Sequence, residues 1–170
     1  DSATIEYRGT SSANAVVLFN GAQHVIFENC TVRNTDNYYS VCFQIMGGTS
    51  DIHIRNNTIR PGSSATSSYS GGVIFSSQPN GYIYDGISSN GTRCYIEGNN
   101  FNGGSIGVSL RGGNTSDYIS DNYILNNTIK NAYNYGVYAY YAENIVVEGN
   151  NISDFRNSGA YSITYGYSHG

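Results

Sequence analysis

Hydrophobic and polar positions alternate in short stretches along this chain, and similar stretches recur at intervals. Five of them read ENCTV (28–32), RNNTI (55–59), EGNNF (97–101), LNNTI (125–129) and EGNNI (148–152). An apolar residue stands three positions before the third letter of each phrase, and another stands two positions after it. Alternation of this kind predicts short β-strands with one buried face. No helical stripe with a 3.6-residue period is visible at useful length.

The spacing of the five phrases indicates a repeated unit. Their third residues are Cys30, Asn57, Asn99, Asn127 and Asn150, so the intervals are 27, 42, 28 and 23 residues. Three of these intervals fit a unit of roughly 25 residues, as in proteins built from stacked repeats. The longest interval indicates an insertion at about 62–92, where turn-forming residues concentrate.

The residue before each third letter is Asn or Gly, and both tolerate a positive φ angle. We therefore expect the strand to bend at Asn29, Asn56, Gly98, Asn126 and Gly149. If the units stack at the roughly 4.8 Å separation of paired strands, the amide side chains that follow the bends lie above one another. They then form a hydrogen-bonded ladder of Asn57, Asn99, Asn127 and Asn150.

A second set of strand-like segments recurs between the phrases, at 15–22, 41–48, 72–77, 107–113, 136–142 and 160–166. Together the two sets predict an all-β fold, a parallel β-helix solenoid of about five to six coils with an internal Asn ladder. Right-handed crossover is the general preference for parallel strands. We expect a single domain over 1–170, with repeats from about 13 to 166.

The recurring phrases resemble the repeats of right-handed parallel β-helix proteins of the pectate lyase-like and NosD-like kinds. The resemblance covers about 13–166, and it implies the fold rather than one activity, because this scaffold carries both enzymes and inert surface proteins. In composition and style the chain also looks like surface or sheath proteins of methanogenic archaea.

Charge is sparse, which excludes some classes of partner. Charged residues make up 12% of the chain, the net charge is −4, and Lys130 is its single lysine. A nucleic-acid-binding surface would need clustered Lys and Arg, so we expect no nucleic-acid partner. No apolar run approaches 18 residues, so we expect no membrane span.

Sequon-like triplets permit an extracellular location. They begin at Asn29, Asn56, Asn90, Asn114, Asn126 and Asn151. Each is a possible glycosylation site, although a chain rich in Asn, Ser and Thr produces such triplets by composition alone.

The chain offers few catalytic residues. Asn34-Thr35-Asp36 matches the first carboxylate motif of polygalacturonases, and Ser168-His169-Gly170 is similar to their Gly-His-Gly. There is no Asp-Asp pair and no Arg-Ile-Lys motif to supply the separated acid and base that hydrolysis requires. We therefore predict no catalytic, cofactor-binding or metal-binding residues and no cofactor, and we expect Asp117 and Asp121 to be solvated.

The three cysteines fall at different positions of the repeat. Cys94 takes an apolar core position, and Cys30 replaces the ladder Asn in the first phrase. Cys42 lies between Val41 and Phe43, which we expect to point inward, so Cys42 should point outward. An odd number of cysteines suggests an intermolecular disulfide, for which Cys42 is the candidate; the alternative is a free thiol.

The outermost coils of a solenoid expose unpaired backbone groups unless a cap covers them. No cap is recognisable in 1–12 or 161–170. The chain is then a domain from a longer solenoid, a subunit whose ends pair with neighbours, or a short rod with unrecognised caps.

The leading hypothesis is a non-enzymatic extracellular structural protein of the cell surface or cell wall. It would assemble with copies of itself through open edges into a filament, wall or sheath, with glycans as a further possible partner. The alternative is a polysaccharide lyase or hydrolase, or a carbohydrate-binding β-helix domain, which predicts carboxylates clustered along one outer column.

Overall fold

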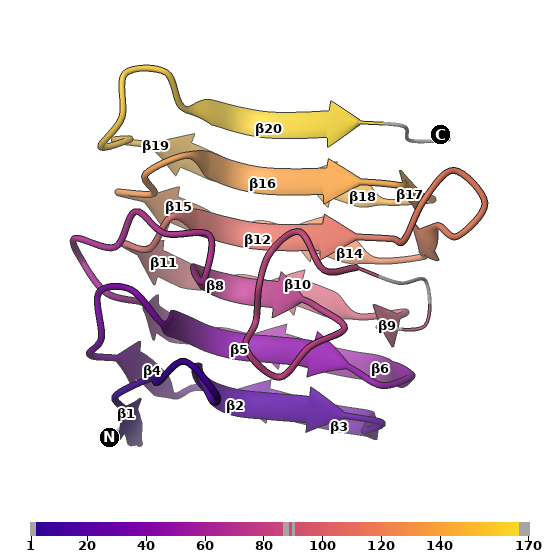
Figure 1. The fold of residues 1–170 in the computed structure, drawn as a ribbon, viewed down its shortest axis with the longest axis horizontal. Helices are drawn as coiled ribbons and strands as arrows, with labels where there is room; N and C mark the ends of the chain where they lie inside the picture. The colour runs from indigo at the N-terminus through magenta and orange to yellow at the C-terminus, as the bar shows by residue number, and fades with distance from the viewer. Residues whose placement is uncertain (1–2, 87–88, 90, 167–170) are drawn as a thin grey trace.

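The computed structural model describes residues 3–86, 89 and 91–166, and these residues form twenty β-strands and no α-helix. Figure 1 shows the strands stacked in tiers from the N-terminal end to the C-terminal end. Three tall sheets account for most of them, and each sheet contributes one strand to a coil.

Sheet A holds the short strands that follow the Asn corners. Its members, in spatial order, are β1 (Thr4–Tyr7), β4 (Thr31–Asn34), β7 (Thr58–Arg60), β11 (Asn100–Asn102), β15 (Thr128–Lys130) and β19 (Asn151–Ser153).

Sheet B faces the viewer in Figure 1. It runs through β2 (Ala15–Asn20), β5 (Ser40–Met46), β8 (Ser70–Phe75), β12 (Ile106–Arg111), β16 (Tyr135–Tyr140) and β20 (Tyr161–Gly166).

Sheet C holds the strands that precede the Asn corners: β3 (Gln23–Glu28), β6 (Thr49–Arg55), β10 (Tyr95–Glu97), β14 (Tyr123–Leu125) and β18 (Val146–Glu148). The two-residue strand β9 (Gly91–Thr92) also pairs with β6, and β13 (Ile119–Ser120) pairs with β17 (Ala142–Glu143).

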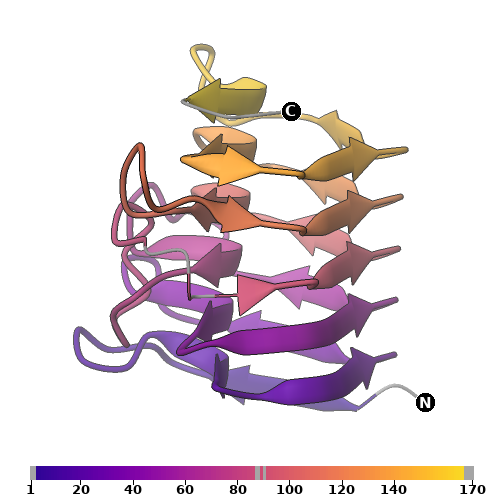
Figure 2. The ribbon, with the colours of Figure 1, turned by 90° about the vertical axis from the view of Figure 1, so that its right-hand side faces the viewer.

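All the strand pairings are parallel, and each strand of a tall sheet pairs with the strands one coil before and after it (Figure 2). The chain is therefore a parallel β-solenoid of about six coils, which confirms the predicted fold class.

The core is a set of apolar columns in register. In sheet A the paired positions run Val32, Ile59, Phe101, Ile129 and Ile152. The first four of these side chains are at most 1% exposed. The apolar positions predicted beside each corner thus stack on one another and fill the interior of the coil.

The segment that follows β8 lies outside the coil. Residues 76–86 cross in front of sheet B, as Figure 1 shows. Ile83 on this segment packs with outward-facing side chains of sheet B, which form a second, smaller core: Val41, Ile74, Ile106 and Tyr138. The predicted insertion region also contains β8 itself, which keeps the regular place of a sheet B strand.

Candidate functional site

The predicted asparagines form a continuous ladder inside the solenoid. Asn57 Nδ2 donates to Asn99 Oδ1 at 3.2 Å, Asn99 Nδ2 to Asn127 Oδ1 at 3.1 Å, and Asn127 Nδ2 to Asn150 Oδ1 at 2.9 Å. The same Nδ2 atoms also donate to carbonyl oxygens of the coil below, such as Ile54 at 2.8 Å from Asn99. Each amide therefore links its own coil to the neighbours on both sides.

The corner before the ladder has the predicted backbone. The φ angles are 57° at Asn29, 54° at Asn56, 63° at Gly98, 54° at Asn126 and 67° at Gly149. This left-handed conformation turns the chain from sheet C into sheet A. The turn carries each ladder amide into the interior, where it satisfies backbone groups that would otherwise lack partners.

A second column of left-handed residues, six positions before the ladder column, was not predicted. Its φ angles lie between 51° and 56°, at His24, Asp51, Arg93, Asp121 and Asn144. Asn, Asp and His are the residue types enriched at positive φ, so four of the five carried a local signal, and only Arg93 is atypical. The constant spacing from the ladder column was a second signal.

Charged and polar side chains of this second column contact one another from coil to coil. Arg93 donates to both carboxylate oxygens of Asp51, from Nε at 2.7 Å and from Nη2 at 2.9 Å. Asn144 Nδ2 donates to Asp121 Oδ1 at 3.2 Å, and His24 Nδ1 lies 3.8 Å from Asp51 Oδ2. The Arg93 hydrogen bonds lower the pKa of Asp51 to about 2.

Cys42 does not point outward, and that prediction is wrong. Its side chain is 0% exposed and belongs to the main core together with Phe43, the next residue. Val41, which we expected to point inward, instead packs with Ile83 outside the coil, so the strict alternation fails at Cys42 and Phe43. Burial raises the pKa of the Cys42 thiol to about 12. An intermolecular disulfide at Cys42 therefore has no accessible thiol to form from.

The other two cysteines lie at the interior, as their repeat positions predict. Cys94 is 1% exposed in the core, and burial raises the pKa of its thiol to about 12. Cys30 is half-buried at the first corner, where its backbone N–H donates to Asn57 Oδ1 at 3.0 Å. All three cysteines are free thiols.

Five of the six sequon asparagines are exposed: Asn29, Asn56, Asn114, Asn126 and Asn151. Asn90 lies outside the described residues. Exposure makes the five accessible to a glycosylating enzyme, and glycan attachment itself stays a prediction.

The motif Asn34-Thr35-Asp36 builds a turn. Asn34 is 1% exposed, and its Nδ2 donates to the carbonyl oxygens of Asn14 at 2.7 Å and Val41 at 3.1 Å. Asp36 Oδ1 accepts backbone N–H groups of Tyr38 and Tyr39, which lowers the pKa of this carboxyl. His169, of the second motif, lies outside the described residues. In the described part of the chain, no three His, Cys, Asp or Glu side chains gather as a metal site.

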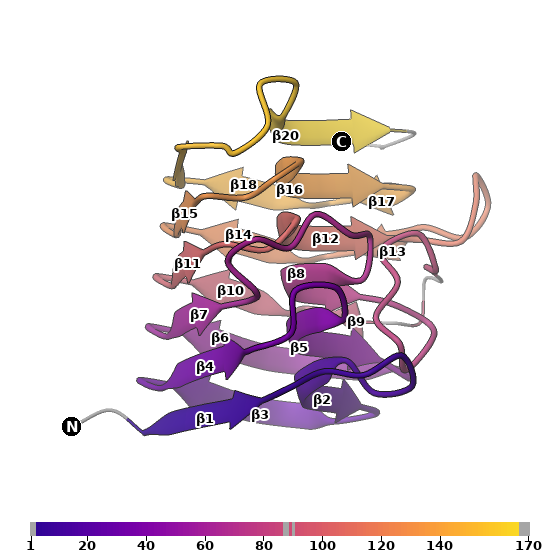
Figure 3. The same ribbon diagram turned by 60° about the vertical axis from the view of Figure 1, so that its left-hand side comes forward.

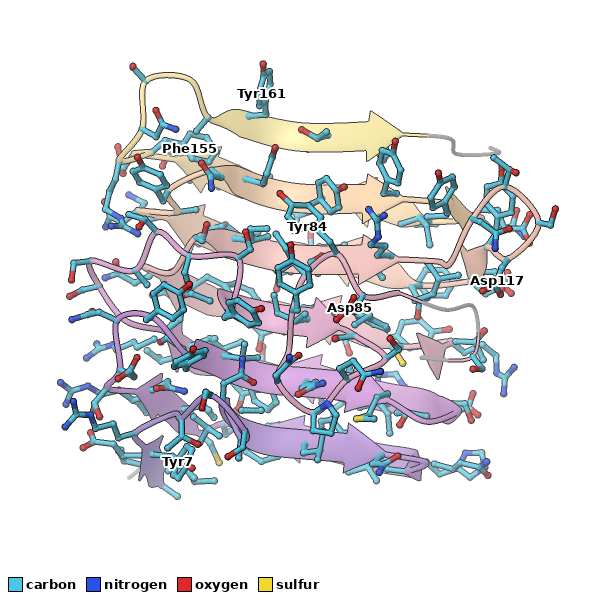
Figure 4. The ribbon with its side chains drawn as sticks, viewed as in Figure 1. Tyr7, Tyr84, Asp85, Asp117, Phe155 and Tyr161 are labelled. Carbon is cyan, nitrogen blue, oxygen red and sulfur yellow. The ribbon has the colours of Figure 1, made fainter. Side chains whose placement is uncertain are left out.

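Tyrosines form a connected network over the outer face of sheet B. Ring centroids of neighbouring members lie 4.7 to 6.3 Å apart, and Arg111 stands over three of the rings at 4.9 to 5.7 Å. Figure 4 shows Tyr84 on the segment in front of sheet B and Tyr161 rising from β20. The network comprises Tyr38, Tyr39, Tyr69, Tyr82, Tyr84, Tyr118, Tyr135, Tyr138, Tyr140, Tyr141 and Tyr161.

The outermost strands carry most of the exposed apolar side chains. Of ten large hydrophobic residues that are exposed in the described part of the chain, eight lie on β1, β2, β3, β18 or β20. They are Ile5, Tyr7, Leu18, Ile26, Val146, Tyr161, Ile163 and Tyr165.

A basic cleft of about 630 Å³ opens beside the C-terminal ends of β4 and β7. These strands are neighbours in sheet A, on the side that Figure 3 brings forward. Arg33 and Arg60 occupy paired positions on the two strands and both line the cleft. Polar side chains complete the wall, among them Thr35, Asn37, Ser63 and Asn102.

Membrane-spanning helices and similarity to known proteins were both sought. The described residues contain no helix long and apolar enough to cross a membrane. Comparison with protein-family models, with curated proteins and with solved structures found no match.

Proposed function

We propose that this protein is a non-enzymatic structural solenoid that packs end to end with copies of itself. The observation that carries the proposal is the concentration of exposed apolar side chains on the outermost strands. Exposed apolar side chains that gather in a contiguous patch mark an interaction site.

The two ends of the stack match in geometry. At one end β2 presents an unpaired edge of six residues, and at the other end β20 presents another of six residues. Ile163 continues the interior column of Val137, and Tyr165 continues that of Ala139. Their exposed fractions are 39% and 53%, and among the described residues no strand lies beyond β20 to cover them. A second copy stacked in the same direction would cover these side chains and pair the open strand edges.

Such a contact joins two different surfaces, so it does not close on itself. Contacts that join unlike surfaces along one axis produce open filaments. We infer from this geometry that the assembly is a filament or a sheet of filaments. An extracellular, cell-surface location belongs to the same proposal, and the resemblance of the repeats to archaeal surface or sheath proteins and the exposed sequon asparagines support it.

The test is the size distribution of the purified chain in sedimentation velocity, together with negative-stain images. We expect filaments whose length increases with protein concentration, and we expect Ile163→Lys in β20 to abolish them by placing a charge in the contact. The control Tyr38→Lys changes an exposed ring that lies outside the outermost strands, and it should leave assembly intact. Single particles at every concentration, or particles that depolymerise an acidic polysaccharide, would contradict the proposal.

A further inference from the structure

The cleft beside β4 and β7 is lined by two positively charged side chains and by no negatively charged one. Arg33 and Arg60 are paired across the two strands, and paired positions on adjacent strands lie roughly 4.8 Å apart. Like charges placed directly opposite one another destabilise a sheet. A negative group near both guanidinium groups would relieve this repulsion.

The protein supplies that group to Arg33 only. Arg33 Nη1 donates to Glu6 Oε2 at 3.0 Å, on the side of β1. On the other side of Arg60 the cleft is lined by Asn102, which is neutral. In the described part of the chain, no carboxylate lies within ion-pair distance of Arg60, and this side chain is exposed.

Every other cationic side chain among the eight lysines and arginines has a partner within the described residues. Arg8, Arg33, Arg55, Arg93 and Lys130 contact carboxylates. Arg111 stands over tyrosine rings, and Arg156 donates to backbone carbonyl oxygens, among them Asn131 at 2.7 Å. Arg60 is therefore the one cationic side chain for which the described residues show no such partner.

The rest of the cleft wall offers donors. Asn102 Oδ1 accepts from Asn131 Nδ2 at 2.8 Å, and Asn37 Oδ1 accepts from the backbone N–H of Ser64 at 3.4 Å. With their oxygens engaged, both asparagines can present their amide N–H groups to a ligand. The hydroxyls of Thr35 and Ser63 add two further groups, and the lining residues include no carboxylate.

We propose that this cleft is a binding site for an oxyanion, a carboxylate, sulfate or phosphate group, held by Arg33 and Arg60. A guanidinium group matches these planar or tetrahedral oxyanions with two parallel N–H···O bonds. The volume of the cleft also exceeds the needs of a single ion and suits a group carried on a larger molecule such as an acidic sugar. The site is independent of the end-to-end contact, because it lies on the side of the stack.

The test is calorimetric titration of the full chain with three ligands: inorganic sulfate, inorganic phosphate and a uronic acid oligosaccharide. We expect saturable binding with one site per chain for at least one of them. Tighter binding of the oligosaccharide than of both inorganic ions would identify a glycan as the source of the oxyanion, whereas equal binding would identify a free ion.

The decisive variant is Arg60→Gln, with Lys130→Gln as its matched control. Both remove one positive charge from the same face of sheet A, but Lys130 pairs with Asp154 and does not line the cleft. We expect at least tenfold weaker binding in Arg60→Gln and unchanged binding in Lys130→Gln, while circular dichroism confirms that both variants fold. Equal binding by the two variants, or no saturable binding of any ligand to the unmodified chain, would overturn the proposal.

Discussion

Two of the left-handed corners that recur along the coils use the same backbone conformation with different side-chain chemistry. The corner that leads into sheet A directs neutral amides into the interior, where Asn57, Asn99 and Asn127 are at most 2% exposed. The corner that leads into sheet C directs charged side chains into solvent, where the side chain of Arg93 is 54% exposed. Both columns are hydrogen-bonded from coil to coil, and they differ in burial and in charge.

Burial should decide how much each column stabilises the fold. A buried polar group that loses its partner cannot recover a hydrogen bond from water, so its full desolvation cost remains. An exposed ion pair that loses one member is resolvated, and salt already screens it. The amide column is therefore expected to dominate stability, although its hydrogen bonds are no shorter than those of the charged column.

The largest effect is expected from Asn99→Ala in the middle of the ladder. This change leaves the backbone N–H of Asn57 and the carbonyl oxygen of Ile54 without their partners. We expect the free energy of unfolding in urea to fall by about 3 kcal/mol, from the cost of orphaned buried groups. Asn150→Ala, in the half-buried last step of the ladder, is the control and should cost less. Equal losses at the two positions would contradict the role of burial.

A smaller effect is expected from Gly98→Ala at the bend itself. The φ angle of 63° is costly for any residue with a Cβ atom, by about 1–2 kcal/mol per residue. The added Cβ would also lie 2.7 Å from Asn56 Oδ1, which must then move. Thermal unfolding should show the loss. The reverse change in the same column, Asn126→Gly, should be neutral or slightly stabilising, and a loss there would argue against backbone strain as the cause.

The smallest effect is expected from Asp51→Asn in the charged column. This change removes the double hydrogen bond from Arg93. We expect a loss of stability below that of Gly98→Ala, which disappears at high salt because both side chains contact solvent. Urea unfolding at low and high ionic strength measures it. Glu143→Gln is the control, because it removes one negative charge from a side chain that forms none of the ion pairs in the described part of the chain.

The same pair predicts a dependence on pH. The pKa of Asp51 is lowered from 3.8 to about 2, so the folded state holds its proton less tightly than the unfolded state does. The contribution of Asp51 to stability is therefore complete above about pH 4 and is lost as the pH falls towards 2. Unfolding temperatures measured between pH 2 and 5 should fall more steeply in the unmodified chain than in Asp51→Asn.

The sequence predicted those structural features that depend on neighbouring residues and on the spacing of the repeats. The ladder asparagines and the left-handed residues beside them follow from the alternation and the Asn or Gly at each corner. The second corner was missed because its residue type changes from coil to coil, from His24 through Asp51 to Arg93, so no single letter recurs in that column. Cys42 was misplaced because strict alternation fails where β5 brings two successive side chains into the core.

The basic cleft could not be predicted from the sequence, for a different reason. Arg33 and Arg60 are 27 residues apart in the sequence, and only the pairing of β4 with β7 places them together. Among the described residues Arg60 has no carboxylate partner, and this too depends on the side chains that the neighbouring coils place beside it. No local pattern around either arginine contains that information.

By itself, the sequence determined that the backbone coils in parallel tiers, because a period of two combined with a longer repeat leaves few other ways to bury the apolar columns. The tertiary structure alone decided which side chains from different coils meet. Contacts between coils depend on stacking register and on loops of unequal length, such as the segment after β8 that covers Val41. The core therefore follows from local chemistry, whereas the candidate binding surfaces arise from the stacking.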